Sequence, residues 1–374
     1  NLVFLVDVSG SMQSPDKLGL VKRSLRLLVN RMTGQDHIAL AVYAGAAGTV
    51  LESTPGSDKA KILAAIDGLE AGGSTHGSAG IELAYALAGQ HYIDGGINRV
   101  IIASDGDMNV GTVDLSALKN LVERKRKTGI SLTTLGFGTG NYNYALMEQL
   151  DDVGNGTASY IDSLKEAQKV LVNELQSTLL TVASDVKIQI EFNPALVSEY
   201  RLIGYENRLL QREDFTNDKV DAGDIGAGHT VTALYEIVLT GSADGRVPAL
   251  RYGDKPQHSR TDTDELAFVK LRYKQPGQEH SVELTRTITS SSINDSMEDS
   301  SDNLRFAASV AGFGQLLRGG TFLANWDYED ALALARSARG EDPHGYRGEL
   351  VNLIELAQSL SSAPGQRELL GSNL

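Results

Sequence analysis

The first half of the chain alternates short apolar runs with amphipathic segments, and this alternation constrains the fold more than any other feature. Apolar runs occupy residues 2–6, 38–43 and 100–103, and residues 130–137 form a further strand-like segment that ends in glycines. Between them, apolar residues recur every three or four positions, a spacing that predicts helices. Strands that alternate with helices form a parallel sheet that is covered on both faces. We therefore predict an α/β fold with a doubly wound, mostly parallel sheet.

The pattern changes near Ser184. Val186, Ile188 and Ile190 alternate with polar residues, and similar strand-like segments follow at 229–239, 266–273 and 281–288. Several strands without intervening helices are typical of an antiparallel sandwich, so we predict a β-sandwich-like domain after the parallel sheet.

Helical spacing returns after Leu304, beyond a connector at 289–303 that is rich in Ser, Asp and Asn. We predict a helical C-terminal region here. The predicted domains are residues 1–182, with the parallel sheet, residues 183–290, with the sandwich-like sheet, and residues 291–374, with the acidic connector and the helices.

Composition excludes several functions. The chain has 374 residues, a net charge of -14 and no cysteine. An acidic surface repels phosphate backbones, so we predict no nucleic-acid partner. No apolar stretch approaches the roughly 20 residues of a membrane-spanning helix, so we predict no membrane span. The chain begins inside an apolar run at Asn1, and we expect that upstream sequence, with any targeting signal, has been removed.

Polar residues follow the first apolar run directly, in the segment Asp7-Val8-Ser9-Gly10-Ser11. Asp7, Ser9 and Ser11 alternate, so a tight loop can turn their oxygens toward one point. We expect Gly10 to give the backbone the freedom for that turn. Carboxylate and hydroxyl oxygens are hard ligands that suit magnesium, manganese or calcium.

Two further loops supply similar groups. Asp105 follows the buried run at 100–103, and Thr75 precedes a predicted helix. Ligands of doubly wound sheets bind beyond the carboxyl ends of the strands, where these loops would meet. Each piece also has a simpler explanation, because Asp7 and Thr75 could cap helices and Asp105 could belong to an ordinary turn. The combination, with each piece in order, favours a metal site.

These residues resemble the metal-ion-dependent adhesion site of the von Willebrand factor A family, whose pattern is Asp-x-Ser-x-Ser, a distant Thr, and an Asp followed by Gly. The resemblance covers residues 1–182 and implies a Rossmann-like domain with one divalent cation, magnesium first and manganese or calcium as alternatives. It implies that the hydroxyl groups contact the cation directly and that the carboxylates act wholly or partly through water. The implied ligands are Asp7, Ser9, Ser11, Thr75 and Asp105.

The whole chain is similar to a group of bacterial envelope-associated proteins with a von Willebrand A domain and a C-terminal region of unknown function. The motif at 105–111 and the tail at 306–360 carry this similarity. It implies a location in the bacterial cell envelope or periplasm, with a lipoprotein anchor supplied by a missing N-terminal segment.

The resemblance implies a non-enzymatic protein-binding module for adhesion or complex assembly, whose cation binds an acidic side chain of a partner protein. Ser9 stands where phosphatases with an Asp-x-Asp motif need a second carboxylate. The sequence also has no Gly-x-Ser-x-Gly elbow and no Walker phosphate loop. Two alternatives stay open: a subunit that docks on an ATPase machine, as in metal chelatases, and a phosphohydrolase that uses the cation.

Overall fold

The computed structural model describes most of the chain and divides it into two compact units. Unit 1 comprises Asn1–Val186, Asp221–His229 and Tyr273–Ser281, and unit 2 comprises Lys187–Val220, Thr230–Arg272 and Val282–Leu374. The residues that the structure describes are 1–73, 77–106, 115–138, 143–154, 156–174, 180–205, 209–220, 222–243, 245–247 and 264–361.

Unit 1 contains a six-stranded sheet with the strand order β3-β2-β1-β4-β5-β6. Neighbouring strands are parallel except for β3, which pairs antiparallel with β2 at the edge. The strands are β1 (Leu2–Asp7), β2 (His37–Tyr43), β3 (Ala47–Pro55), β4 (Asn98–Ser104), β5 (Ile130–Phe137) and β6 (Ala158–Ile161).

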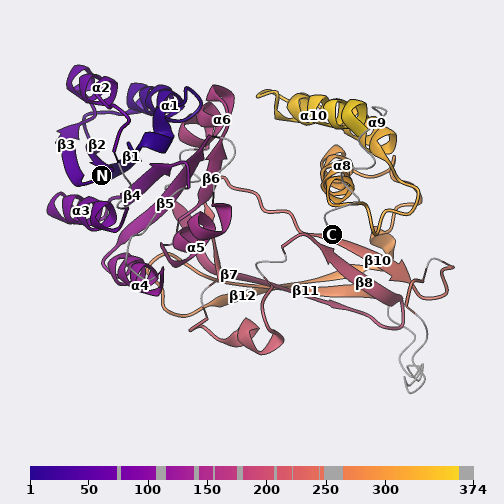
Figure 1. Cartoon of the computed structure of the whole chain (residues 1–374). Coiled ribbons are helices and arrows are strands. Elements are labelled where there is room, and N and C mark those ends of the chain that lie inside the picture. The colour runs from indigo at the N-terminus through magenta and orange to yellow at the C-terminus, as the bar shows by residue number, and fades with distance from the viewer. Residues whose placement is uncertain are drawn as a thin grey trace. The chain divides into compact units, whose positions relative to one another are not determined.

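Helices cover both faces of this sheet, as Figure 1 shows. Alternate residues of β1 therefore enter different cores: Phe4 packs with the helices of one face, and Val3 and Leu5 pack with those of the other. One face carries α1 (Leu18–Arg31), α2 (Lys59–Asp67) and α6 (Leu164–Gln168), and the other carries α3 (Gly77–Gln90), α4 (Leu115–Arg126) and α5 (Tyr144–Gly154). Fully burying one large apolar side chain stabilises the fold by about 1.5–3 kcal/mol.

The order of the strands reverses between β1 and β4. β1 lies between β2 and β4 and is parallel to both, so the chain leaves β1 toward one side and returns for β4 on the other. Such a reversal of strand order opens a space where ligands of α/β sheets bind. Asp7 ends β1, and Asp105 follows β4.

The strands after residue 180 form a four-stranded sheet in the order β12-β11-β7-β9 and an antiparallel pair, β10-β8. Alternation along β7 does not place its apolar side chains inside. Lys187 is buried and donates to the carbonyl oxygens of Asp214 at 3.3 Å and Asn217 at 2.5 Å, whereas Ile188 is 46% exposed. The strands are β7 (Thr181–Phe192), β8 (Val197–Ile203), β9 (Gly223–Gly226), β10 (Leu234–Leu239), β11 (Glu265–Lys274) and β12 (Val282–Thr289).

Among the described residues of unit 2 are the α-helices α8 (Asp302–Leu317), α9 (Tyr328–Ser337) and α10 (Tyr346–Ser361). Asp327 begins α9 with a capping box that satisfies backbone donors of its first turn. The helices share a small apolar core, and Gly312 leaves room for the indole of Trp326, which a Cβ at that position would overlap.

The predicted fold class is confirmed: a mostly parallel α/β sheet, further antiparallel strands and C-terminal helices. The predicted domain limits at residues 182 and 290 stay predictions. Within the described ranges, no helix is both long and apolar enough to cross a membrane.

Candidate metal centre

Asp7 is the central polar group at the carboxyl end of β1, and it is fully buried. One carboxylate oxygen accepts from the Ser9 backbone N–H at 2.9 Å, and the other accepts from the hydroxyls of Tyr43 and Ser104, both at 3.0 Å. Burial raises the pKa of Asp7, and these hydrogen bonds oppose the rise. The three donors therefore favour the ionised form of this buried carboxylate.

Tyr43, at the end of β2, serves this site as a hydrogen-bond donor. Its side chain is fully buried, and burial together with the nearby charge of Asp7 raises the pKa of its phenol well above the ordinary value. The hydroxyl therefore stays protonated and donates a hydrogen bond to the carboxylate.

The loop after β1 is fastened to the loop that leads to residue 75. The Gly10 N–H donates to the Gly73 carbonyl at 3.1 Å, and the Gly72 N–H donates to the Val8 carbonyl at 2.7 Å. Ser9, not Asp7, occupies the N-cap position of the short helix η1 (Gly10–Gln13), and its side chain makes no capping bond.

The expectation for Gly10 was wrong. Gly10 does not adopt a positive φ, and a Cβ there would lie 3.5 Å from the Gly73 oxygen, an ordinary contact. The turn therefore does not depend on the special freedom of glycine at this position.

Two hydroxyls project next to Asp7. The Oγ atoms of Ser9 and Ser11 lie 3.0 Å apart, and Ser9 is buried. Magnesium binds oxygen at about 2.0–2.1 Å in an octahedron, so two adjacent ligands lie about 3 Å apart. The spacing of the two hydroxyls fits such a pair of ligands.

Asp105 brings a second, fully buried carboxylate, directly after Ser104, which already contacts Asp7. One of its oxygens lies 2.9 Å from the Nζ atom of Lys17, whose side chain is 11% exposed. Sequence reasoning missed Lys17, because a lysine at the start of a helix is usually a surface residue. Its only signal was its position shortly after the Asp-x-Ser-x-Ser motif.

The residues that the structure describes fit a hard divalent cation. Two buried carboxylates and two close hydroxyls offer oxygen ligands, and Asp7 has only neutral hydrogen-bond donors among its described partners. No group of three or more His, Cys, Asp or Glu side chains capable of holding a metal occurs in the described ranges, so a cation bound here would also need hydroxyl ligands. Thr75 lies outside the described residues.

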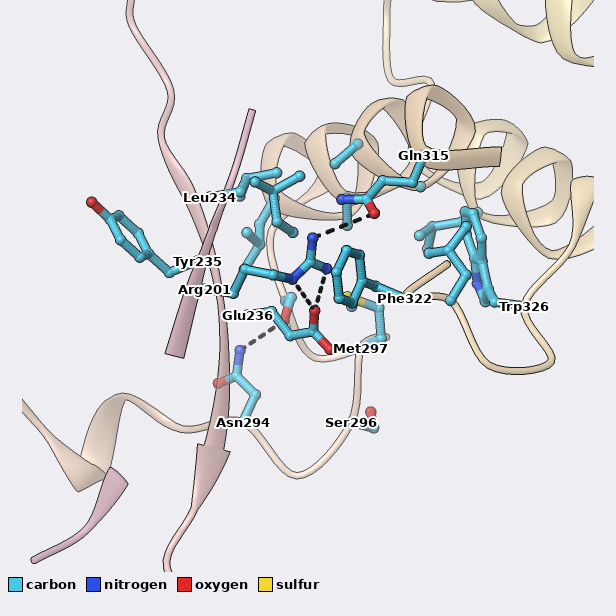
Figure 2. A pocket seen from close by; sticks show the side chains of 18 of the residues that line it. Arg201, Leu234, Tyr235, Glu236, Asn294, Ser296, Met297, Gln315, Phe322 and Trp326 are labelled. Atoms are coloured by element: carbon cyan, nitrogen blue, oxygen red, sulfur yellow. Dashed lines mark hydrogen bonds and ion pairs between the residues drawn. The ribbon is translucent and has the colours of Figure 1, made fainter. Parts of the chain in front are cut away.

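A second polar region, which the sequence did not predict, lies within unit 2. A cavity of about 710 Å³ is lined by residues of β8, β10, the connector and α8. Figure 2 shows the Arg201 guanidinium directed toward Glu236, Gln315 and the ring of Phe322. Arg201 donates to Glu236 Oε2, and its guanidinium lies 4.2 Å from the Phe322 ring centroid. Arg246 pairs with Glu236 Oε1 at 3.0 Å.

Comparison with known families matches the two halves of the chain to two family descriptions. Residues 1–177 match the von Willebrand factor type A domain, and residues 177–360 match the family described as "Uncharacterized protein YfbK, C-terminal". The chain therefore combines a von Willebrand factor type A domain at residues 1–177 with a YfbK-type C-terminal region of unknown function.

The chain is similar to particular proteins of these families. It is 49% identical over 362 residues to the "Uncharacterized protein YfbK" of Escherichia coli (strain K12), an alignment that covers 96% of this chain and 62% of that protein. It is 28% identical over 198 residues to human inter-alpha-trypsin inhibitor heavy chain H4, covering 49% of this chain and 21% of that protein. The chain thus spans less than two thirds of these relatives' lengths.

Among solved structures, a von Willebrand factor type A protein from Catenulispora acidiphila aligns over 91% of this chain and 80% of its own, with 16% identity and a TM-score of 0.47. Von Willebrand A domains typically mediate interactions between proteins.

Proposed function

We propose that this chain is a non-enzymatic, metal-dependent protein-binding module. One divalent cation, with magnesium first and manganese or calcium as alternatives, binds at the carboxyl ends of β1 and β4. Ser9, Ser11 and Thr75 contact it directly, and Asp7 and Asp105 act wholly or partly through water. The cation supplies a Lewis-acidic position that accepts a carboxylate from a partner protein.

One observation carries this proposal. Asp7 is buried, has only neutral hydrogen-bond donors among its described partners, and lies beside the Ser9 hydroxyl, which is 3.0 Å from the Ser11 hydroxyl. Burying a carboxylate is costly unless a cation or hydrogen bonds compensate for it. A bound cation would compensate for part of the cost of burying the Asp7 carboxylate.

The overall charge of the protein supports a local cation as the source of attraction. A net charge of -14 repels an acidic partner. Ions screen this repulsion over a Debye length of about 8 Å at physiological ionic strength, but they screen a short, partly dehydrated metal–carboxylate bond much less. Moderate salt should therefore weaken binding little or strengthen it.

Affinity capture from native cells tests the function. The parent should retain a partner in magnesium and release it in chelator, while Thr75→Ala and Asp105→Ala variants that fold normally should retain little. Ser14→Ala is a matched control, because the Ser14 hydroxyl contacts Asp16 rather than the proposed site. Equal capture by the folded Thr75→Ala variant would leave the metal no role in binding.

Neither the ATPase-docking alternative nor the phosphohydrolase alternative gains a specific observation from the geometry. A location in the cell envelope also stays a prediction that rests on the family resemblance.

A further inference from the structure

Lys17 places a positive charge inside the proposed metal centre. Its Nζ atom lies 2.9 Å from Asp105 Oδ2, with the Asp105 side chain fully buried and the Lys17 side chain 11% exposed. Exposed ion pairs are screened by water and contribute little, whereas charges in a buried pair interact strongly because the local dielectric is low. This pair therefore affects any other cation that approaches Asp105.

The Lys17 side chain lies in a narrow space that involves the start of α1, Gly138 after β5 and Tyr160. The residue immediately precedes α1, where the helix dipole disfavours a positive charge. Gly138, after β5, has a φ of +80°, and a Cβ there would overlap the aliphatic stem of Lys17. The Gly138 carbonyl accepts from the Tyr160 hydroxyl at 2.8 Å, which fixes the wall of this space. The ammonium is thus positioned by the fold.

The Lys17 ammonium changes the net charge of the proposed metal-loaded site. Asp7 and Asp105 together contribute two negative charges, and Lys17 cancels one of them. A divalent cation then gives the loaded site a net positive charge, whereas without Lys17 the two carboxylates would neutralise the cation completely. The ammonium also repels the cation directly.

We propose that Lys17 is a built-in counter-ion that competes with the divalent cation for Asp105. It lowers the affinity of the site for metal, and it leaves the metal-loaded site with positive charge to attract a partner's carboxylate. This inference rests on the proposed metal-dependent function and names the residue that sets the metal affinity.

Magnesium titration of the parent and of Lys17→Met by calorimetry tests the inference. Removing the charge should tighten magnesium binding about tenfold or more, because charges at partly buried sites interact strongly. Lys17→Arg, which keeps the charge, should bind magnesium nearly as the parent does. Lys22→Met is the matched control, because the Lys22 ammonium contacts only the Asp67 carbonyl among its described partners, away from the site.

Lys17→Met leaves Asp105 buried without its ammonium, so this variant could unfold in chelator. In that case its thermal midpoint is followed as magnesium is added, and it should rise more steeply with magnesium than the parent's midpoint. Equal or weaker magnesium binding by Lys17→Met would overturn the role of Lys17 while leaving the proposed function intact. Absence of magnesium binding by both proteins would overturn both, and binding by Lys17→Met alone would support the competition.

Discussion

The metal centre of unit 1 and the cavity of unit 2 both contain ion pairs, but they differ in burial. Asp105 is fully buried and Lys17 is 11% exposed, whereas the side chains of Arg201, Glu236 and Arg246 are 29%, 32% and 46% exposed. Water can replace the partners of the second group but not those of the first. The stability of buried charges therefore depends strongly on their partners. Only the buried pair of unit 1 is expected to respond strongly when a partner is removed.

The largest expected effect is at Asp105. Asp105→Ala leaves the Lys17 ammonium in a buried slot without its carboxylate, and breaking a buried pair in this way costs about 3–5 kcal/mol. Urea unfolding in chelator measures the loss. Asp67→Ala is the control, because the Asp67 pair with Arg26 is about half exposed, and it should cost less than about 1 kcal/mol. Equal losses at the two positions would remove the distinction between the regions.

Next is a change that separates stability from binding within unit 1. Ile101 is buried in β4 at the sheet core, and Ile101→Ala should cost about 2–5 kcal/mol because it leaves a cavity. Thr75→Ala removes a proposed ligand and no core volume, so it should leave the free energy of unfolding nearly unchanged but abolish magnesium binding. Chemical unfolding and calorimetry on both variants check the two halves of this prediction.

Packing in unit 2 gives a smaller effect. Gly312→Ala puts a Cβ into the Trp326 ring and should cost about 1–3 kcal/mol through overpacking. Gly314→Ala, in the same helix, meets no atom within 4 Å and should be neutral or stabilising by about 0.5–1 kcal/mol. Only Gly312→Ala should lower the thermal unfolding midpoint, and a similar loss for both variants would contradict the packing described for Trp326.

The smallest effect is expected at the cavity of unit 2. Arg201→Met should lower the free energy of unfolding by less than about 1 kcal/mol, because its pair with Glu236 is partly solvated. The difference from the parent should shrink further in high salt. A loss as large as that of Asp105→Ala would show that the ion pair of the cavity stabilises the fold as strongly as the buried pair does.

Much of unit 1 could be predicted from the sequence because periodicity reports burial directly. The strand predicted at 130–137 became β5 with the same limits, and the helix predicted around Leu18 became α1. The positions of Asp7 and Asp105 could be predicted because they lie at the ends of two predicted strands, and parallel strands bring their carboxyl ends to one edge of the sheet. The metal itself and its five proposed ligands stay predictions.

Other features depend on contacts between distant residues, which periodicity does not contain. Lys17 pairs with a carboxylate 88 positions away, and Tyr43 reaches Asp7 across 36 positions. Lys187 alternates with apolar residues, as a solvent-facing lysine would, yet it is buried because the carbonyl oxygens of Asp214 and Asn217 receive its ammonium. The cavity around Arg201 likewise gathers segments that share no local motif.

Calorimetric titration of magnesium into the parent and into Asp7→Asn tests the proposed metal centre most directly, with Asp67→Asn as the control for losing an exposed carboxylate. Asn keeps the shape of Asp7 but removes its charge. We predict one bound cation for the parent and for Asp67→Asn, and no detectable binding by an Asp7→Asn protein that circular dichroism shows to be folded. A folded parent that bound neither magnesium, manganese nor calcium would contradict the proposed metal centre, as would unchanged binding by Asp7→Asn.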